Sequence, residues 1–274
     1  MVTFKNNAGL GIFFLSSLLM RTAWSDDLSG FDCLIEPHSV VEVGTSEEGV
    51  LETLEVERGD VISKGQVLAI LESEVEKVAV ELARVRAERH ATIKARRETV
   101  EFMKRELDRI ADLVEKKLVP EQEKDKAETE LALAKFQLQE EEENMHIAET
   151  ELKRAREALR RRTIHSPIDG VVMEHLLSAG ELVEYQTRII KIAQIVPLNV
   201  EVIIPVEFYN RIDLGMEAEV TPHVPGITTR SARVVAVDPV VDAASNTFGV
   251  QLELPNEDQS VPGGIRCEIR FITQ

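Results

Sequence analysis

The feature that most constrains the fold is a repeat whose two copies stand far apart in the chain. Residues 49–71 and 170–192 align without a gap, at an offset of 121 residues. In both copies a glycine turn separates short strand-like runs, Gly59-Asp60 in the first and Gly180-Glu181 in the second. Neither copy is large enough to bury its own apolar face. We therefore predict that the two copies pack on each other as one small β-sandwich with approximate twofold symmetry.

The segment between the copies, residues 74–161, is predicted to form two long helices. It contains no glycine, and its only proline is Pro120. In its second half, small and apolar residues recur in alternating steps of four and three, which is typical of a coiled coil. This row is Ala127, Leu131, Ala134, Leu138, Glu141, Met145, Ala148, Leu152, Ala155 and Leu159.

The first half of the segment carries a row of the same kind, but in two phases. The row begins with Val75, Val78, Leu82 and Val85, and it resumes with Ile93, Arg96, Val100, Met103, Leu107, Ile110 and Val114. A phase shift alters the supercoiling of a packed helix without ending it. We therefore predict one continuous helix up to the turn near residue 118.

Residues 118–121, Leu118-Val119-Pro120-Glu121, are the predicted turn between the two arms. Proline fixes its own φ and disfavours helix for the residue before it, so the first helix ends there. A connection this short makes the arms antiparallel, and roughly 40–45 residues per arm give a rod of about 60–65 Å. Facing residue numbers should then sum to about 237, which places Arg96 opposite Glu141. Either these two form an ion pair between the arms or both point outward independently.

The remaining segments complete an elongated α+β fold. Residues 198–274 contain β-branched runs separated by turn dipeptides such as Pro225-Gly226, a spacing that favours a small antiparallel β-barrel. The predicted order is an N-terminal strand at 26–39 that joins the barrel, sandwich halves at 40–73 and 162–197, the hairpin at 74–161 and the barrel at 198–274.

Residues 1–25 have the pattern of a secretory signal peptide. Lys5 precedes an uncharged, mostly apolar run, and Ala23 and Ser25 supply the small residues of a cleavage site. The apolar run is too short to span a bilayer comfortably, and the alternative is a short uncleaved anchor. We therefore expect the mature chain to be soluble in an extracytoplasmic space.

The two cysteines, Cys33 and Cys267, lie near opposite ends of the mature chain. In an oxidising compartment they can pair and tie the ends together. Two separate buried thiols are the alternative, and the sequence leaves both open.

Composition and motifs point away from an enzyme. The net charge of −17 repels phosphate backbones, which excludes nucleic acid as a favoured partner. Aromatic residues make up only 4% of the chain, and large ligand pockets depend on aromatic walls. No phosphate loop, nucleophile elbow or metalloprotease helix occurs, and the six histidines are scattered. We predict no catalytic residue, no metal site and no cofactor.

The split repeat resembles the two halves of a biotinyl/lipoyl module, on residues 59–68 and 166–172. In carriers of that kind a tight hairpin presents a modified lysine, whereas here the nearest lysine, Lys77, falls within the predicted helix. A lipoyl module that is split by a helical hairpin and followed by a β-barrel resembles the periplasmic adaptors, or HlyD-like membrane fusion proteins. Residues 237–242, followed by Asn246-Thr247, are similar to a barrel turn of that family.

The same resemblance implies a function for the turn. Adaptors of drug-efflux systems carry an Arg, Leu and Ser trio near the tip that contacts an outer-membrane channel. Arg109 and Leu113 match the first two positions, and Pro120 stands at the third. The predicted channel contact is therefore Arg109, Leu113, Val119 and Pro120, with ordinary helix surface and core as the alternative for the first two.

The implied protein is an adaptor of a tripartite efflux system, and the resemblance places it in the periplasm, peripheral to the inner membrane, after removal of the signal peptide. It links an inner-membrane transporter, favoured as a proton-driven permease of the RND type, to the outer-membrane channel, and it self-associates as a hexameric ring that seals the export conduit. Three rivals remain: an adaptor for an ATP-driven exporter, a lipoyl or biotinyl carrier protein, and a free-standing structural coiled coil.

Overall fold

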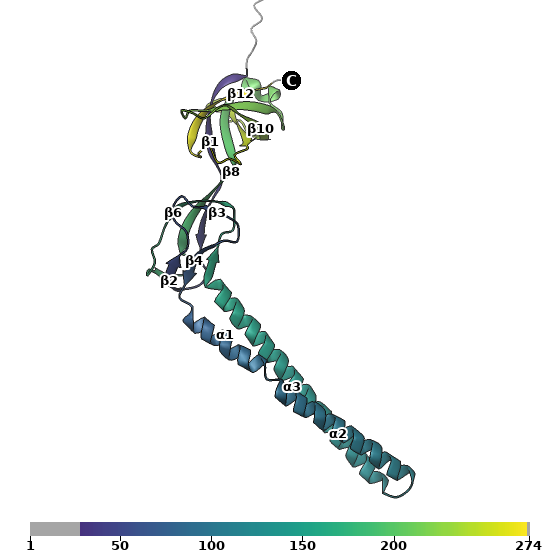
Figure 1. Ribbon diagram of the computed structural model, residues 1–274. Coiled ribbons are helices and arrows are strands. Elements are labelled where there is room, and N and C mark those ends of the chain that lie inside the picture. The colour runs from purple at the N-terminus through teal and green to yellow at the C-terminus, as the bar shows by residue number, and fades with distance from the viewer. Residues whose placement is uncertain (1–27, 273–274) are drawn as a thin grey trace, which may run out of the picture.

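The computed structural model describes residues 28–272, so the predicted signal peptide at 1–25 lies outside the described residues. Three units follow one another along an elongated molecule: a β-barrel at one end, a β-sandwich in the middle and a pair of helical arms at the other end (Figure 1). Among the described residues, no helix combines the length and the apolar character needed to cross a bilayer.

The sandwich consists of two four-stranded sheets. The first sheet has the order β1-β8-β6-β3, from the end of β1 (Ser29–Gly44), the start of β8 (Arg188–Pro205), β6 (Gly170–His175) and β3 (Val61–Ile62). The second sheet has the order β5-β4-β2-β7, from β5 (Thr163–His165), β4 (Val67–Leu71), β2 (Gly49–Leu54) and β7 (Leu182–Val183). Each repeat copy thus contributes strands to both sheets.

The strand pairing repeats the sequence offset of 121 residues. Val61 pairs with Val171 in the first sheet, and Val50 pairs with Leu182 in the second. In the same way, the pair Val172–Ile192 corresponds to the pair Leu51–Leu71. The predicted twofold sandwich is therefore confirmed. Its core is aliphatic: Leu51, Ile62, Leu68, Leu71, Val172, Val183, Ile189, Ile190 and Ile192 are at most 2% exposed.

The barrel closes through six strands in the order β1-β12-β9-β10-β11-β8, because β8 pairs back with β1. Its other strands are β9 (Glu217–Pro222), β10 (Arg230–Val237), β11 (Thr247–Leu254) and β12 (Ile265–Phe271), and a short 3₁₀ helix, η1 (Val206–Arg211), follows β8. Alternate residues of each strand point into one apolar core that includes Ile35, Leu198, Leu252 and Phe248. Closure leaves the barrel without a free sheet edge.

Two strands are common to the barrel and the sandwich. β1 and β8 pair from Cys33–Val202 in the barrel to Gly44–Arg188 in the sandwich, with a register shift between Pro37 and Ser39. Beside the crossing, the buried Asn256 donates hydrogen bonds to the carbonyls of Ile195 and Val261, both at 3.0 Å. A two-stranded ribbon and a buried amide therefore connect the units, rather than a single linker.

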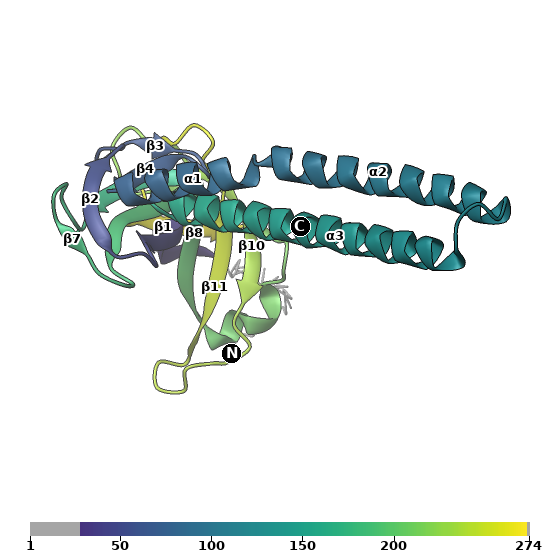
Figure 2. The same cartoon turned by 90° about the horizontal axis from the view of Figure 1, so that it is seen from below.

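The helical arms are α1 (Glu74–Ala87) and α2 (His90–Glu115) on one side and α3 (Glu121–Arg161) on the other. Figure 2 shows α1 and α2 lying one after the other along α3. The prediction of one continuous first helix is wrong, because Glu88 and Arg89 interrupt it. Ala87 and Ile93 both face α3 but are six residues apart, whereas a regular heptad would place equivalent residues seven apart. The interruption at Glu88 and Arg89 compensates for this difference of one residue.

The break also explains a second error. Val75, Val78, Leu82 and Val85 were expected to face the opposite arm, but all four are exposed. Ala83 and Ala87 are buried in their place, with the half-buried Glu76 and Val80 completing the row that faces α3. Small residues let α1 approach α3 closely, and the larger aliphatic row of α1 is left on the outer surface of the rod.

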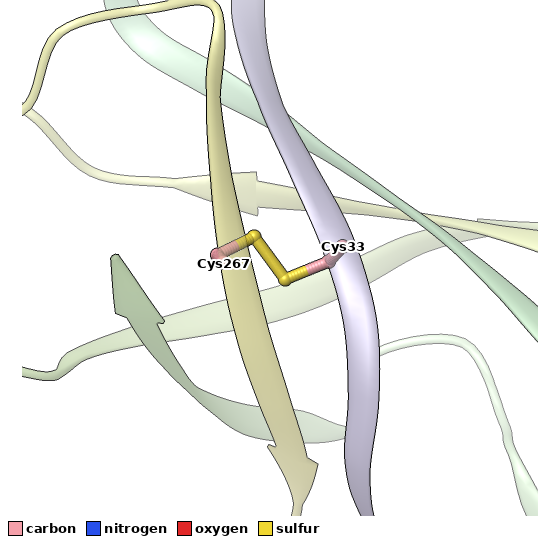
Figure 3. Close-up of a disulfide and its surroundings, with 2 residues drawn as sticks. All are labelled: Cys33 and Cys267. Carbon is pink, nitrogen blue, oxygen red and sulfur yellow. A yellow bond between two sulfur atoms is a disulfide. The ribbon is translucent and has the colours of Figure 1, made fainter. Parts of the chain in front are cut away.

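A disulfide joins the two ends of the described chain. Cys33 of β1 and Cys267 of β12 are direct partners across the strand pair, with a Cα–Cα distance of 4.9 Å (Figure 3). Both residues belong to the barrel core. The bond closes a loop with a sequence separation of 234 residues, so it restricts the unfolded chain strongly.

We predict that Cys33→Ser with Cys267→Ser lowers the free energy of unfolding of the barrel by about 2–5 kcal/mol, because the open chain gains loop entropy on unfolding. Urea unfolding followed by circular dichroism measures the change. Reduced wild-type protein is the control and should unfold at the same midpoint as the variant. Equal midpoints for oxidised wild type and variant would show that the bond contributes nothing.

Candidate partner-binding site at the tip of the helical arms

The turn between α2 and α3 has a defined hydrogen-bonded geometry. The Leu118 N–H donates to the Leu113 carbonyl at 2.9 Å, and the Lys117 N–H donates to the Val114 carbonyl at 2.8 Å. These two bonds are those of the Schellman motif, which ends a helix through a residue in the left-handed region. Lys117 occupies that position, with φ 56°. The turn thereby satisfies the last carbonyls of α2 and fixes the direction in which Leu118 points.

Leu118 is the apolar residue that the tip exposes. Its side chain is 67% exposed, although the residue after a Schellman turn often packs back onto its own helix. Sequence reasoning placed Leu118 in the turn but left it out of the contact site. The available signal was an aliphatic residue directly before Val-Pro, in a turn where polar residues are more usual.

The four predicted contact residues lie near this turn but differ in accessibility. Arg109 is exposed and forms an ion pair with Glu106 at 3.0 Å, one turn back on the same helix. Leu113 and Val119 are half-buried between the arms. Pro120 is exposed and caps α3 in an extended conformation, φ −66° and ψ 151°. Arg109, Leu118 and Pro120 are thus available to a partner, whereas Leu113 and Val119 mainly support the turn.

The predicted ion pair between Arg96 and Glu141 is not formed within residues 28–272. Arg96 Nη1 instead donates to Gln137 Oε1 at 3.0 Å, one turn away along α3. The ion pair between the arms is formed one residue further along each helix, where Arg97 lies 3.5 Å from Glu142. Nearer the sandwich, Arg86 approaches Glu151 at 3.6 Å. The residue numbers 86 and 151 sum to 237, so the predicted register of the two arms holds at this pair. The predicted partner of Arg96, however, is wrong.

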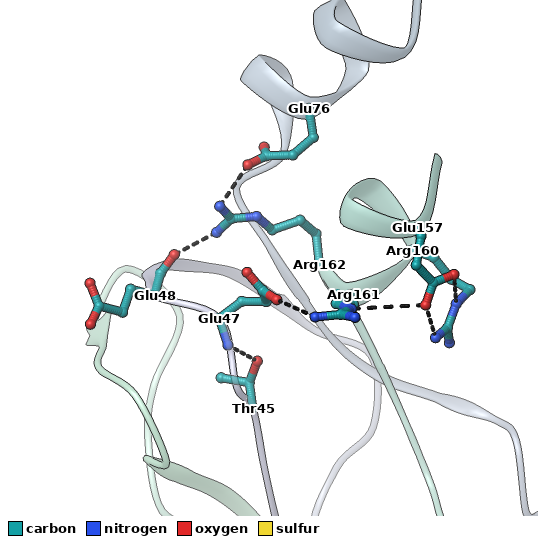
Figure 4. Close-up of polar contacts among 8 residues, drawn as sticks. All are labelled: Thr45, Glu47, Glu48, Glu76, Glu157, Arg160, Arg161 and Arg162. Carbon is teal, nitrogen blue, oxygen red and sulfur yellow. Dashed lines mark hydrogen bonds and ion pairs between the residues drawn. The ribbon is translucent and has the colours of Figure 1, made fainter. Parts of the chain in front are cut away.

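The base of the arms is held by Arg162, which directly follows α3. Its Nη2 donates to Glu76 Oε1 at 2.6 Å, and its Nη1 donates to the Glu48 carbonyl at 2.5 Å (Figure 4). The side chains of Arg162 and Glu76 are only 18% and 17% exposed. A single guanidinium thus connects the end of α3, the start of α1 and the backbone directly before strand β2 of the sandwich.

Gly49 leaves room for this contact. A Cβ atom at Gly49 would lie 2.7 Å from Arg162 Nη1, so a larger residue there must displace the guanidinium. The adjacent Arg161 and Arg160 are different in kind, since they form exposed pairs with Glu47 and Glu157. The hydrogen bond from Arg160 lowers the pKa of Glu157. Because three arginines follow one another, the sequence does not indicate that only Arg162 connects the arms to the sandwich through a largely buried contact.

The structure places the remaining candidate groups outside any such site. Lys77, the lysine nearest the first repeat copy, lies within α1 and binds Glu74 at 2.6 Å. It is therefore not on a hairpin turn, where a carrier lysine would stand. Across residues 28–272, no group of three or more His, Cys, Asp or Glu side chains has the arrangement of a metal site.

Comparisons with known proteins agree with this architecture. Residues 39–194 match the family described as "CzcB-like, barrel-sandwich hybrid domain". The match covers more than half of the chain, so this protein belongs to that family, and the prediction of a periplasmic adaptor family is confirmed. A curated relative, an uncharacterised protein of Haemophilus influenzae, is 24% identical over 225 residues. These residues are 82% of this chain and 52% of the relative, so the chain spans about half the length of that protein.

Solved structures show the same fold. MacA from Actinobacillus actinomycetemcomitans superimposes with a TM-score of 0.74 at 23% identity, covering 89% of this chain and 78% of MacA. The membrane fusion protein Spr0693 from Streptococcus pneumoniae R6 gives 0.62 at 14% identity, covering 89% of this chain and 98% of that one. At these identities the likeness establishes the fold alone.

We predict that Arg162→Ala lowers the free energy of unfolding by about 1–3 kcal/mol, because it leaves the Glu76 carboxylate and the Glu48 carbonyl without a donor. The matched control is Arg160→Ala, which removes a solvent-exposed pair and should change the free energy of unfolding much less than Arg162→Ala does. Urea unfolding, with hydrogen exchange at the first turn of α1, measures both. Equal effects of the two variants would contradict the role assigned to Arg162.

We also predict that Lys117→Gly stabilises the tip, because glycine adopts a positive φ without the cost of about 1 kcal/mol that a Cβ brings. Amide exchange of residues 114–118 should slow about fivefold. Lys116→Gly is the control: its φ of −78° needs no glycine, so that variant should speed exchange. Slower exchange in both variants, or in neither, would refute the Schellman assignment.

Proposed function

We propose that this chain is a non-enzymatic periplasmic adaptor that connects an inner-membrane efflux transporter to an outer-membrane channel. Family membership supports the adaptor class. The observation that carries the connection is the placement of Leu118: an exposed aliphatic side chain stands at the end of a helix of 41 residues, about 60 Å from the sandwich. Single exposed apolar side chains are common on protein surfaces, so the proposal rests on the position of Leu118 at the far end of the arms and not on its exposure alone.

The proposal assigns a task to each unit. The tip, with Arg109, Leu118 and Pro120, contacts the channel; the sandwich and barrel lie toward the inner membrane; and several copies, proposed as six, surround the substrate path. One rod and two small β units enclose no conduit, so transport by this route requires self-association. Energy would come from the transporter.

We propose a permease of the RND type as that transporter, with an ATP-driven exporter as the alternative. Capture of the adaptor together with its transporter after mild cross-linking distinguishes the two, because the proteins carry different sequences and only the exporter binds nucleotide.

The test of the proposed function is Leu118→Asp. A carboxylate at the tip cannot enter an apolar contact without losing its hydration, so cross-linking to an outer-membrane protein through a photo-reactive residue at the exposed Arg109 should fall at least about tenfold. The control is Leu214→Asp in the barrel, where the replaced side chain is 70% exposed. It should leave cross-linking unchanged. Unchanged cross-linking in Leu118→Asp, or no outer-membrane product in the wild type, would refute the proposal.

A further inference from the structure

The helix α1 carries an aliphatic row on the side that points away from α3. The four members of this row are between 52% and 79% exposed: Val75, Val78, Leu82 and Val85. They recur in steps of three and four, which is the spacing of residues that pack in a coiled coil. The residues of α1 that face α3 include the small Ala83 and Ala87 instead.

The helix α3 is covered less completely by α1 than by α2. Opposite α2, the α3 residues Ala127, Leu131 and Ala134 are buried. Opposite α1, the continuation of the same α3 row is only half-buried, at Ala148, Leu152, Ala155 and Leu159. The aliphatic row of α1 and the α3 surface that could cover it are therefore both partly exposed in the observed packing.

A different face of α1 would meet α3 if α1 and α2 formed one helix. Counting back from Ile93 in the alternating steps of the α2 row gives Arg89, Arg86, Leu82, Ala79 and Val75. Each of the last four lies one residue before a residue of the row that faces α3 in the structure. The two faces therefore differ by a rotation of α1 about its own axis of about 100°. This rotation would bring Val75 and Leu82 to α3 and would place Val78 and Val85 at the edge of the contact.

The sizes of the side chains fit this second packing. Facing residue numbers sum to about 237, as the pair of Arg86 and Glu151 shows. Leu82 would then lie opposite Ala155, and Ala79 would lie opposite Leu159. A large side chain would meet a small one at each level, which is how packed helices fill the space between them.

The break between the helices leaves space for the two arginines of the continuous row. Arg86 and Arg89 border an open hollow of about 250 Å³ between the arms, whose other walls include Ile93, Met145 and Glu141. In a continuous helix the aliphatic parts of both arginines would fill this hollow, while their guanidinium groups reach carboxylates such as Glu141.

We propose that α1 has two packing states and that the contact between Arg162 and Glu76 holds the observed one. Glu76 is half-buried on the face toward α3, so a rotation of about 100° would carry its carboxylate away from Arg162. The observed state keeps this ion pair but leaves the aliphatic row exposed and the first arm broken. The second state loses the ion pair, covers the row and makes the arm continuous. Two packings of one sequence compete in this way when each satisfies groups that the other leaves exposed.

The same contact links the state of the arm to the orientation of the sandwich. Arg162 also donates to the Glu48 carbonyl, directly before β2. A turn of the sandwich against the arms would pull on both bonds of this one guanidinium and release α1. This inference goes beyond the proposed function, because it holds whatever the tip of the arms binds.

The test is Glu76→Ala in the full chain, followed by amide hydrogen exchange of residues 91–93. Because α2 begins at His90, these amides have no acceptor within their own helix. In a continuous helix they would donate to the carbonyls of residues 87–89, so their exchange should slow about tenfold. If the ion pair only stabilised the base of the arms, its loss would loosen α1 and exchange would not slow. Unchanged or faster exchange of residues 91–93 would overturn the inference.

A second substitution checks that slower exchange comes from the rotation. Adding Leu82→Asp to Glu76→Ala would force a carboxylate toward α3 in the second state, so exchange should return to within about twofold of the wild type. The matched control adds Val240→Asp, in the barrel, where the replaced side chain is 77% exposed. It should keep the slow exchange. Slow exchange that persists with Leu82→Asp would refute the second packing, and circular dichroism checks that each variant is folded.

Cysteine pairs with Ala155→Cys report directly which face of α1 meets α3. The pair with Ala83→Cys should form a disulfide in the otherwise wild-type chain. The pair with Leu82→Cys should form at least about five times more disulfide once Glu76→Ala is added, as measured by mass spectrometry of peptides. Glu81→Cys is the control, because residue 81 points away from α3 in both states. An equal rise for Glu81→Cys and Leu82→Cys would mean that α1 detaches instead of rotating, and the inference would be wrong.

Discussion

The arrangement of the whole molecule depends on the half-buried contact between Arg162 and Glu76. A small rotation at the base of helical arms of this length displaces the tip by a distance that grows with the length of the arms. Arg162 limits this freedom because one planar guanidinium bonds to the start of α1 and to the backbone before β2 at once. Its position directly after α3 couples both arms to the sandwich. Gly49 contributes by having no side chain at the point of closest approach.

At the opposite end of the sandwich, the orientation of the barrel is fixed by shared strands instead of a side-chain contact. Within residues 28–272 no helix enters at this end, and the direction of the barrel is set by two strands, β1 and β8, which are shared by both units. Hydrogen-bonded strands resist stretching but bend and twist more easily than a packed joint, and the register shift between Pro37 and Ser39 lies at the crossing. The buried Asn256 adds a contact between the barrel and the crossing. The molecule therefore has two different junctions, a half-buried side-chain contact toward the tip and a pair of shared strands toward the barrel.

Much of this architecture was predictable from the sequence, and the exceptions have physical causes. The sandwich could be predicted from the repeat because residues that are equivalent at the offset of 121, such as Leu51 and Val172, both lie in its core. Core positions accept mainly apolar residues, so the two copies stayed recognisably alike there. The row on α3 was visible because its small and apolar residues coincide with its buried positions. On α1, however, valine and leucine form a stronger heptad pattern than Ala83 and Ala87, and hydrophobicity alone favours the wrong face. Periodicity identifies an apolar row but not which surface covers it. Arg162 could not be singled out for a similar reason. In the sequence it is one of three consecutive arginines, and only the structure shows that it alone bonds to Glu76.

Internal symmetry suggests how so small a unit can hold a pair of long helical arms. A twofold sandwich has every surface twice, and only one of each pair is needed to join the arms. The positions equivalent to Ala193 and Val40 at the offset of 121 are Glu72, directly after β4, and Arg161, the last residue of α3. Both lie at the junction with the arms. In the first sheet the corresponding positions are aliphatic, with Ala193 only 4% exposed and Val40 46% exposed. The divergence of the two faces thus confines attachment of the arms to one side of the core.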